Sequence, residues 1–235
     1  MKSILYVEFV GVPGGGKTTR AAHLIDYFSM RRLMCLRYKD VFQWGGEGRL
    51  GPVVAFVNCF VFLVARPSLA RNMWAFWCRG SKSQDFSQRS RRRKLVKLIA
   101  LSSGVHRNSR KGVVVFDQGP LQCLMSWIWM GGHLTDEELR QVINAIFPRS
   151  MNSVFIHVDT DPATAFRRAK KRETQSSALL RGRTPDEAMK MFCHASSTVR
   201  ETLRRLDTVL TIRVYDEDTL LKDFGDFMRE MGVVI

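Results

Sequence analysis

The stretch Gly11-Val12-Pro13-Gly14-Gly15-Gly16-Lys17-Thr18 decides the fold of this chain. It satisfies the pattern G-x-x-x-x-G-K-[ST] and follows the apolar run from Ile4 to Val10, which predicts a buried parallel strand that leads into a phosphate-binding loop. Glycines let successive backbone N–H groups turn toward a phosphate, and the helix expected after the loop adds its positive N-terminal end. The pattern therefore predicts a site for a nucleoside triphosphate.

Within this loop we expect Lys17 to reach the β- and γ-phosphates and the Thr18 hydroxyl to ligate Mg²⁺. The expected cofactors are ATP and Mg²⁺. The residues expected to contact the nucleotide from the loop are Gly11, Pro13, Gly14, Gly15, Gly16, Lys17, Thr18 and Thr19.

A second strand is predicted from Leu33 to Tyr38, and it ends just before Asp40. The carboxyl ends of strands in an open parallel sheet face the ligand crevice, so Asp40 is a candidate general base for an acceptor hydroxyl. Trp44, which follows, is a candidate wall of the acceptor site. The alternative for Asp40 is a helix cap or a surface carboxylate.

A third strand is predicted from Val113 to Phe116, and it ends at Asp117. A carboxylate at this position can hold the Mg²⁺ shell or orient Lys17. Gln118-Gly119-Pro120 follows, with the proline at a plausible first helical position.

The segment between the second and third strands is apolar and rich in tryptophan. We expect Val53 to Ala65 to form a buried helix that lines the acceptor pocket, and the alternative is a membrane-facing hairpin. The basic run from Arg89 to Lys94 predicts an amphipathic helix whose cations form a solvated face. Alternatively, these cations contact a phosphorylated acceptor or acidic lipid.

A basic lid is predicted after the fourth strand, which is expected from Ser153 to Val158. Asp161-Pro162 predicts the start of a helix that carries Arg168 and is followed by Arg172, and a polar segment then leads to Arg181 and Arg183. Two sets of arginines joined in this way suit a lid that closes over phosphates, although a solvated basic helix is the alternative. Capping boxes begin the neighbouring helices at Thr135-Asp136-Glu137-Glu138 and Thr184-Pro185-Asp186-Glu187.

The composition points to an anionic partner. The 235 residues include 37 Lys and Arg against 22 Asp and Glu, which gives a formal charge of +15. A phosphorylated acceptor, an acidic membrane surface and nucleic acid would each suit this charge, but no recognisable nucleic-acid module supports the last. The five cysteines show no paired spacing, which favours a cytoplasmic location, with peripheral contact at the inner membrane surface as an addition.

Together these segments resemble the thymidylate kinase and deoxynucleoside kinase group of P-loop phosphotransferases. The likeness rests on GVPGGGKTT, on VVVFDQGP and on VFIHVDTDPATAFRRAKKR, and it covers most of the chain. It implies that Arg168 and Arg172 occupy the family's arginine positions. A weaker likeness at Asp40-Val41-Phe42-Gln43-Trp44 is similar to the segment that holds the base and a nearby tryptophan in deoxynucleoside kinases.

Two departures from the family pattern bear on the acceptor. Gln118 stands where the family usually has an arginine that touches the acceptor, and Val10 stands where many members have a glutamate. Gln118 therefore joins Asp40 and Trp44 as an expected acceptor-binding residue, and the departures weaken a thymidylate or nucleoside assignment.

We therefore expect an α/β fold: a P-loop NTPase three-layer sandwich with a five-stranded parallel sheet in the order 2-3-1-4-5 and an Arg-rich lid. A single kinase-like domain would span 1–235, with a helical insert at about 50–104 and the lid at about 167–184. The expected activity is ATP-dependent phosphoryl transfer to a small-molecule or glycan acceptor, catalysed by Lys17, Asp40, Asp117, Arg168 and Arg172. The alternatives are a nucleoside or nucleoside-monophosphate kinase and a nucleotide-switched ATPase that binds nucleic acid.

Overall fold

The computed structural model describes residues 5–30, 35–37, 51–78, 88–108, 113–147, 152–172, 179–180, 182–206 and 210–214, with 220, 222, 224–226 and 229 near the C-terminus. The central element is a sheet of five strands in the order β2-β3-β1-β4-β5, and every neighbouring pair is parallel. The strands are β1 (Leu5–Val10), β2 (Cys35–Arg37), β3 (Val113–Phe116), β4 (Asn152–Val158) and β5 (Leu210–Val214). This is the strand order that we expected.

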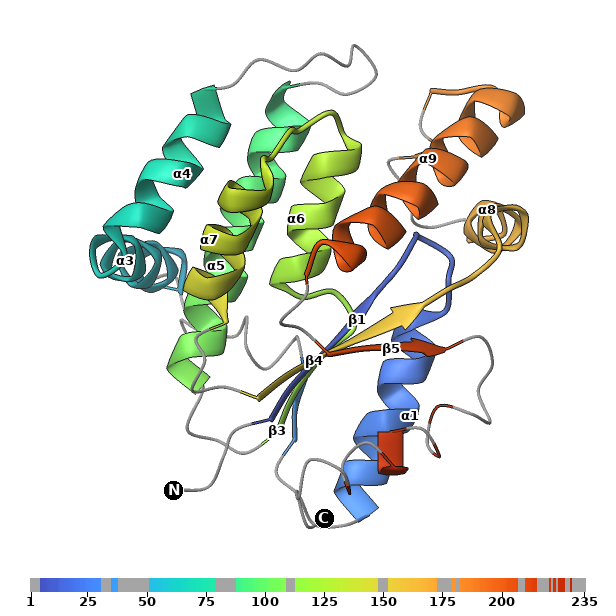
Figure 1. Cartoon of the computed structure of the whole chain (residues 1–235), viewed down its shortest axis with the longest axis horizontal. Helices are drawn as coiled ribbons and strands as arrows, with labels where there is room; N and C mark the ends of the chain where they lie inside the picture. The colour runs from blue at the N-terminus through green and yellow to red at the C-terminus, as the bar shows by residue number, and fades with distance from the viewer. Residues whose placement is uncertain are drawn as a thin grey trace.

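The alternation of side chains along β1 explains why helices cover both faces of the sheet. Leu5, Val7 and Phe9 belong to one hydrophobic cluster, which includes side chains of helix α1 (Lys17–Met30). Tyr6 and Val10 point to the opposite face and join a second, larger cluster. Figure 1 shows the result, with α1 on one side of the sheet and most of the remaining helices on the other.

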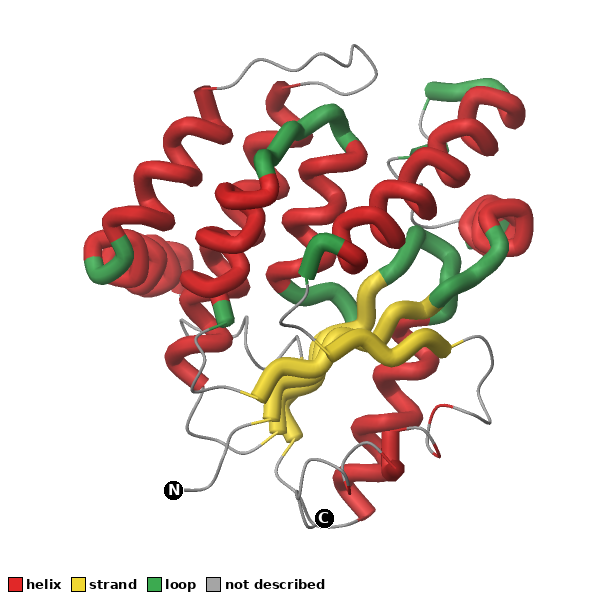
Figure 2. Tube along the Cα trace, in the orientation of Figure 1, coloured by secondary structure: helices red, strands yellow, loops and turns green. Residues whose placement is uncertain are grey.

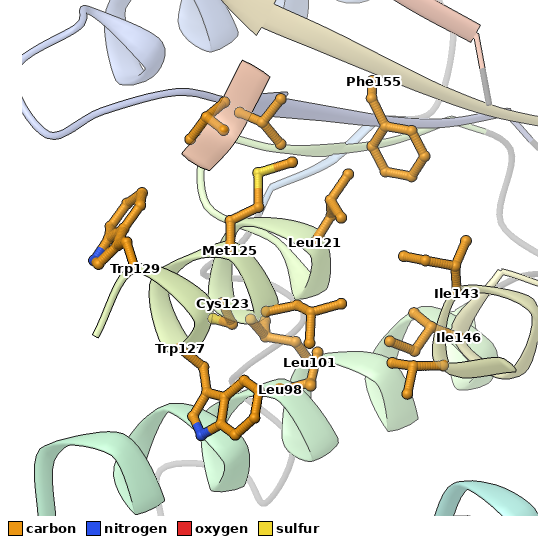
Figure 3. Close-up of a cluster of buried hydrophobic side chains, with 14 of the residues drawn as sticks. Leu98, Leu101, Leu121, Cys123, Met125, Trp127, Trp129, Ile143, Ile146 and Phe155 are labelled. Atoms are coloured by element: carbon orange, nitrogen blue, oxygen red, sulfur yellow. The ribbon is translucent and has the colours of Figure 1, made fainter. Parts of the chain in front are cut away.

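The larger cluster centres on α6 (Pro120–Trp129), which packs between the sheet and the helix α5 (Gln88–Asn108), and α7 (Asp136–Ile146) contributes side chains to the same cluster. In Figure 3, Leu98 and Leu101 of α5 meet one part of α6, and Ile143 and Ile146 of α7 lie nearer the sheet residue Phe155. Most of α6 is therefore buried, with Leu121, Leu124 and Met125 fully enclosed.

Among the residues that the structure describes, α3 (Gly51–Val64), α4 (Pro67–Cys78) and α5 lie between β2 and β3 in the chain, where we expected the helical insert. The apolar segment is helical as predicted, but the prediction that this helix is buried and lines the acceptor pocket is wrong, because Phe56, Phe60 and Val64 of α3 are largely exposed. Apolar side chains lie on more than one side of this helix, so a single packing face cannot bury all of them. No helix within the described residues is both long and apolar enough to cross a membrane.

The predicted helix starts are confirmed by their hydrogen bonds. Thr135 and Glu138 form a reciprocal capping box at α7, and Thr184 and Glu187 form another at α9 (Pro185–Arg204). The Asp161 carboxylate accepts a hydrogen bond from the Thr164 N–H at the start of α8 (Pro162–Lys170). Local sequence chemistry therefore fixes where these three helices begin.

Candidate active site

The glycine-rich loop joins β1 to α1 and has the backbone conformation that its glycines permit (Figure 2). Gly14 and Gly16 have φ values of 80° and 88°, a region that other residues rarely adopt. A Cβ atom at Gly14 would lie 2.2 Å from the carbonyl oxygen of Ala165, so the loop packs directly on the backbone of α8. The loop is thereby fixed between the sheet and the start of the predicted lid.

The Lys17 side chain lies inside this loop. Its Nζ donates hydrogen bonds to the carbonyl oxygens of Gly11 and Val12, both at 2.8 Å. The pKa of Lys17 is lowered to about 7, mainly by burial; the Asp117 carboxylate opposes this shift, and the charges of Arg172 and Lys94 add to it. A phosphate bound in the loop would therefore take the place of these neutral carbonyl oxygens as the charged hydrogen-bond partner of the ammonium.

Thr18, after β1 and the glycine loop, and Asp117, after β3, lie in contact, as the sequence predicts for a magnesium site. The Thr18 hydroxyl donates to Oδ2 of Asp117 at 2.8 Å. A hydroxyl and a carboxylate are oxygen donors that suit Mg²⁺, which usually keeps waters and phosphate oxygens as its other ligands. Within the part of the chain that the structure describes, no group of three or more His, Cys, Asp or Glu side chains is arranged to hold a metal ion.

Three side chains outside the glycine motif hold the loop, and the sequence pattern did not identify them. Arg20 and Thr160 both donate to the carbonyl oxygen of Gly15, at 2.9 and 3.0 Å. The Gln122 side-chain oxygen accepts from the N–H of Gly11 at 2.9 Å. The Gln122 contact is the one that ties the loop to α6.

Glu8 is a further residue that sequence reasoning missed. It is fully buried, and its carboxylate accepts from the Tyr6 hydroxyl at 2.6 Å and from the N–H groups of Leu121 and Gln122 at 3.1 and 2.6 Å. The Glu8 carboxylate therefore accepts hydrogen bonds from backbone N–H groups at the N-terminus of α6, which have no partner within the helix. Burial raises the pKa of Glu8 to about 7, and these hydrogen bonds offset part of that effect. The available signal was an acidic residue in an otherwise apolar strand, which requires a buried partner.

A cavity of about 220 Å³ opens from the loop. One wall is the loop itself, and another is a single side of α6 with its flanking turns, formed by Gln118, Gln122, Ser126, Trp129 and Met130. Lys94 of α5 and Arg172, which follows α8, complete the charged part of the lining. Among the described lining residues there is no carboxylate, so the cavity suits an anionic ligand.

The structure describes three of the four arginines of the predicted lid. A Cβ atom built on Gly16 would lie 3.7 Å from Nη1 of Arg168, so this guanidinium reaches the loop. Arg172 lines the cavity, and Arg183 is half-buried. Arg181, Asp40 and Trp44 lie outside the described residues, so their predicted roles stay predictions.

The basic run on α5 divides into two environments, which corrects the expectation of one solvated face. Arg89, Arg92, Arg93 and Lys97 line a separate open hollow with Trp77 and Val96. Lys94 instead lines the cavity beside the glycine loop. The two groups of cations therefore have different possible partners.

Comparison with known proteins shows a likeness of fold. No protein-family model and no curated protein matches the sequence. Among solved structures, the chain resembles deoxyadenosine kinase from M. mycoides with the products dCMP and a flexible dCDP bound, with a TM-score of 0.52 at 14% identity over 96% of this chain and 99% of that one.

Two further structures of that enzyme give similar values. The form with bound dATP has a TM-score of 0.51 over 95% of this chain and 99% of that chain, and the form with bound dCTP has 0.52 over 96% and 99%, both at 14% identity. At this identity the likeness concerns the fold, an α/β arrangement around a parallel sheet.

Proposed function

We propose that this chain is an ATP-dependent phosphotransferase whose acceptor is a nucleoside or a nucleoside monophosphate. The observation that carries the proposal is the continuity of one cavity, which runs from the glycine loop and Lys17 to a wall of α6. A donor and an acceptor can lie end to end in such a space, which is the arrangement that phosphoryl transfer needs.

The choice of acceptor reverses the order of our expectations. A sugar or glycan acceptor was expected first, but the similar folds belong to proteins named deoxyadenosine kinases, and these favour the nucleoside alternative. The α6 wall agrees with that choice, because it offers polar groups at Gln122 and Ser126 and apolar surface at Trp129 and Met130. Small-molecule sites commonly combine an apolar wall with a few polar groups that orient the ligand.

The residues present fit ATP and Mg²⁺. Bound ATP and Mg²⁺ would supply the γ-phosphoryl group and neutralise part of its charge. Lys17 would exchange the carbonyls of Gly11 and Val12 for phosphate oxygens, and Thr18 and Asp117 would hold the metal. Arg168 and Arg172 would donate to the phosphates from a lid at about 167–184.

The remaining assignments belong to the same proposal. Asp40 is the candidate base for the acceptor hydroxyl, since Asp117 is engaged by Thr18. Arg181 and Arg183 would extend the lid. We propose that all of these parts belong to one domain across 1–235, with the insert at about 50–104.

A panel assay tests the proposal. The purified chain is incubated with ATP, MgCl₂ and each common nucleoside or nucleoside monophosphate, and ADP and the phosphorylated product are measured together. We expect stoichiometric formation of both with at least one acceptor. ADP formation that is independent of every acceptor would contradict the proposal and favour a nucleotide-switched ATPase.

The variant Lys17→Met tests the site within the same assay. We expect turnover to fall by at least roughly 100-fold, because a buried charged donor to the transferred group is lost. Lys170→Met is the matched control, since Lys170 is exposed at the end of α8 and does not line the cavity. Equal activities of the two variants would show that the loop is not the donor site.

A further inference from the structure

We propose that Lys94 binds a phosphate group carried by the acceptor, so that the acceptor is a nucleoside monophosphate rather than a free nucleoside. The inference rests on the proposed function, because it names the acceptor of the same cavity. It concerns a side chain of α5, the helix whose basic run we expected to form a solvated face, with contact to a phosphorylated acceptor as the alternative.

The cations that line the cavity come from different elements, although Lys94 lies near enough to Lys17 for its charge to lower the pKa of that ammonium. Lys17 belongs to the glycine loop, and Arg172 follows α8, which packs on α9. Lys94 instead enters the cavity from α5, which packs along α6. In Figure 1, α5 and α8 lie on different sides of α6. Lys94 thus approaches the cavity from the side of its α6 wall, where the proposed acceptor lies.

Lys94 is also a partly buried cation that has no anionic partner among the described residues. It makes no hydrogen bond or ion pair with any residue that the structure describes, and no described carboxylate lines the cavity. It is half-buried, and this burial lowers the pKa of its ammonium. A partly desolvated cation without a partner gains more from a bound phosphate than an exposed one does.

The donor phosphates do not require Lys94. Lys17 and Arg172 already line the cavity beside the glycine loop, and the Arg168 guanidinium reaches that loop. A free nucleoside is neutral and would leave the Lys94 charge unpaired in the cavity, whereas a monophosphate would pair it. The charge of the lining therefore selects between the two acceptor classes.

Isothermal titration calorimetry of the full chain with dCMP, dTMP, dAMP and dGMP, and with the four matching nucleosides, tests this inference. We expect at least one monophosphate to bind roughly 10-fold or more tightly than its nucleoside. Lys94→Met should weaken that binding by roughly 10- to 100-fold, the effect of losing one charge-assisted hydrogen bond. The affinity for the nucleoside should stay within about twofold, and the affinity for ATP should change less than that for the monophosphate.

Lys97→Met is the matched control, because Lys97 lies on the same helix but lines the separate hollow. It should leave every affinity unchanged, and Lys94→Arg, which keeps the charge, should restore most of the monophosphate affinity. If Lys94→Met fails to fold, as judged by circular dichroism, Lys94→Gln and the ratio of monophosphate to nucleoside affinity in the unmodified chain provide the same test.

The outcomes separate this inference from the proposed function. Equal loss of nucleoside and monophosphate binding, or loss of ATP binding alone, would overturn the role of Lys94. Transfer to nucleosides that does not depend on Lys94 would do so too, while leaving the kinase function intact. Conversely, Lys94-dependent monophosphate binding without any phosphoryl transfer from ATP would keep the anion site and refute the kinase function.

Discussion

At the scale of single residues, the protonation of Lys17 depends on what it contacts. In the loop it donates only to neutral carbonyls, and burial places its pKa at about 7. A triphosphate next to the ammonium favours the charged form and raises that pKa. Binding of ATP should therefore be linked to proton uptake at any pH between these two pKa values.

We predict that ATP binding at about pH 8 takes up close to one proton. Calorimetric titrations in HEPES and in Tris measure this, because the two buffers release different heats on ionisation. Lys17→Met should abolish the difference between the buffers. Identical binding enthalpies of the unmodified chain in both buffers would contradict the prediction.

The protonation of Glu8 is linked to the stability of the fold. Its pKa in the folded chain is about 7, above the ordinary value of 4.5, so the folded state holds more protons than the unfolded state between these values. The contribution of Glu8 to the free energy of unfolding is therefore full below the ordinary value and declines as the pH rises toward about 7.

We predict that Glu8→Gln lowers the free energy of unfolding by ~1–3 kcal/mol, because an amide cannot accept from all three donors that face it. The loss should be larger at about pH 5 than at about pH 8, since only the unmodified chain titrates there. Urea denaturation at the two pH values measures it. A loss that does not change with pH would mean that Glu8 stays ionised in the folded state.

At the scale of elements, the start of α6 is fitted closely against β1. A Cβ atom on Gly119 would lie 2.5 Å from both the Tyr6 hydroxyl and the Glu8 carboxyl group. Three positions later, Gln122 holds the N–H of Gly11. A shift at Gly119 is therefore transmitted to the glycine loop through α6.

We predict that Gly119→Ala destabilises the chain by ~1–3 kcal/mol, because the added methyl group overfills this contact. It should also weaken ATP binding, since the Gln122 contact with the loop moves with α6. Thermal unfolding and nucleotide titration measure both effects. Gly225→Ala is the control, because its added methyl group would approach no atom closer than 3.9 Å.

Helix starts could be predicted from sequence because their causes are local. The capping boxes at Thr135 and Thr184 need only residues three positions apart. The α6 wall could not be predicted in this way: Ser126 and Trp129 line the cavity only because α6 packs between α5 and the sheet. The error at α3 has the same origin, since hydrophobicity alone does not state which side chains find a partner.

At the scale of the whole molecule, the candidate site is assembled from parts far apart in the chain. Lys17 follows β1, Asp117 follows β3, Lys94 belongs to α5 and Arg172 follows α8. The strands were predictable from their apolar runs, and their order agrees with the one that we expected beside the family likeness. The approach of Lys94 was not, because it depends on how a helix of the insert lies against α6.

Because these parts are spread over the fold, a ligand that contacts them stabilises all of it. We predict that ATP at about 100 times its dissociation constant raises the free energy of unfolding by ~2.7 kcal/mol. In a chain of this length that corresponds to a rise of roughly 5–11 °C in the unfolding temperature. Differential scanning fluorimetry measures the shift, and Lys17→Met should remove most of it.

The hydrogen bond from the Gly11 N–H to Gln122 has a consequence for how the two substrates sense each other. Gln122 lines the cavity and also accepts a hydrogen bond from the glycine loop. An acceptor that moves α6 would therefore change the affinity of the protein for the donor nucleotide. Thermodynamic reciprocity then requires the donor to change the affinity of the acceptor by the same factor. We expect Gln122→Leu to weaken the coupling between the two binding equilibria.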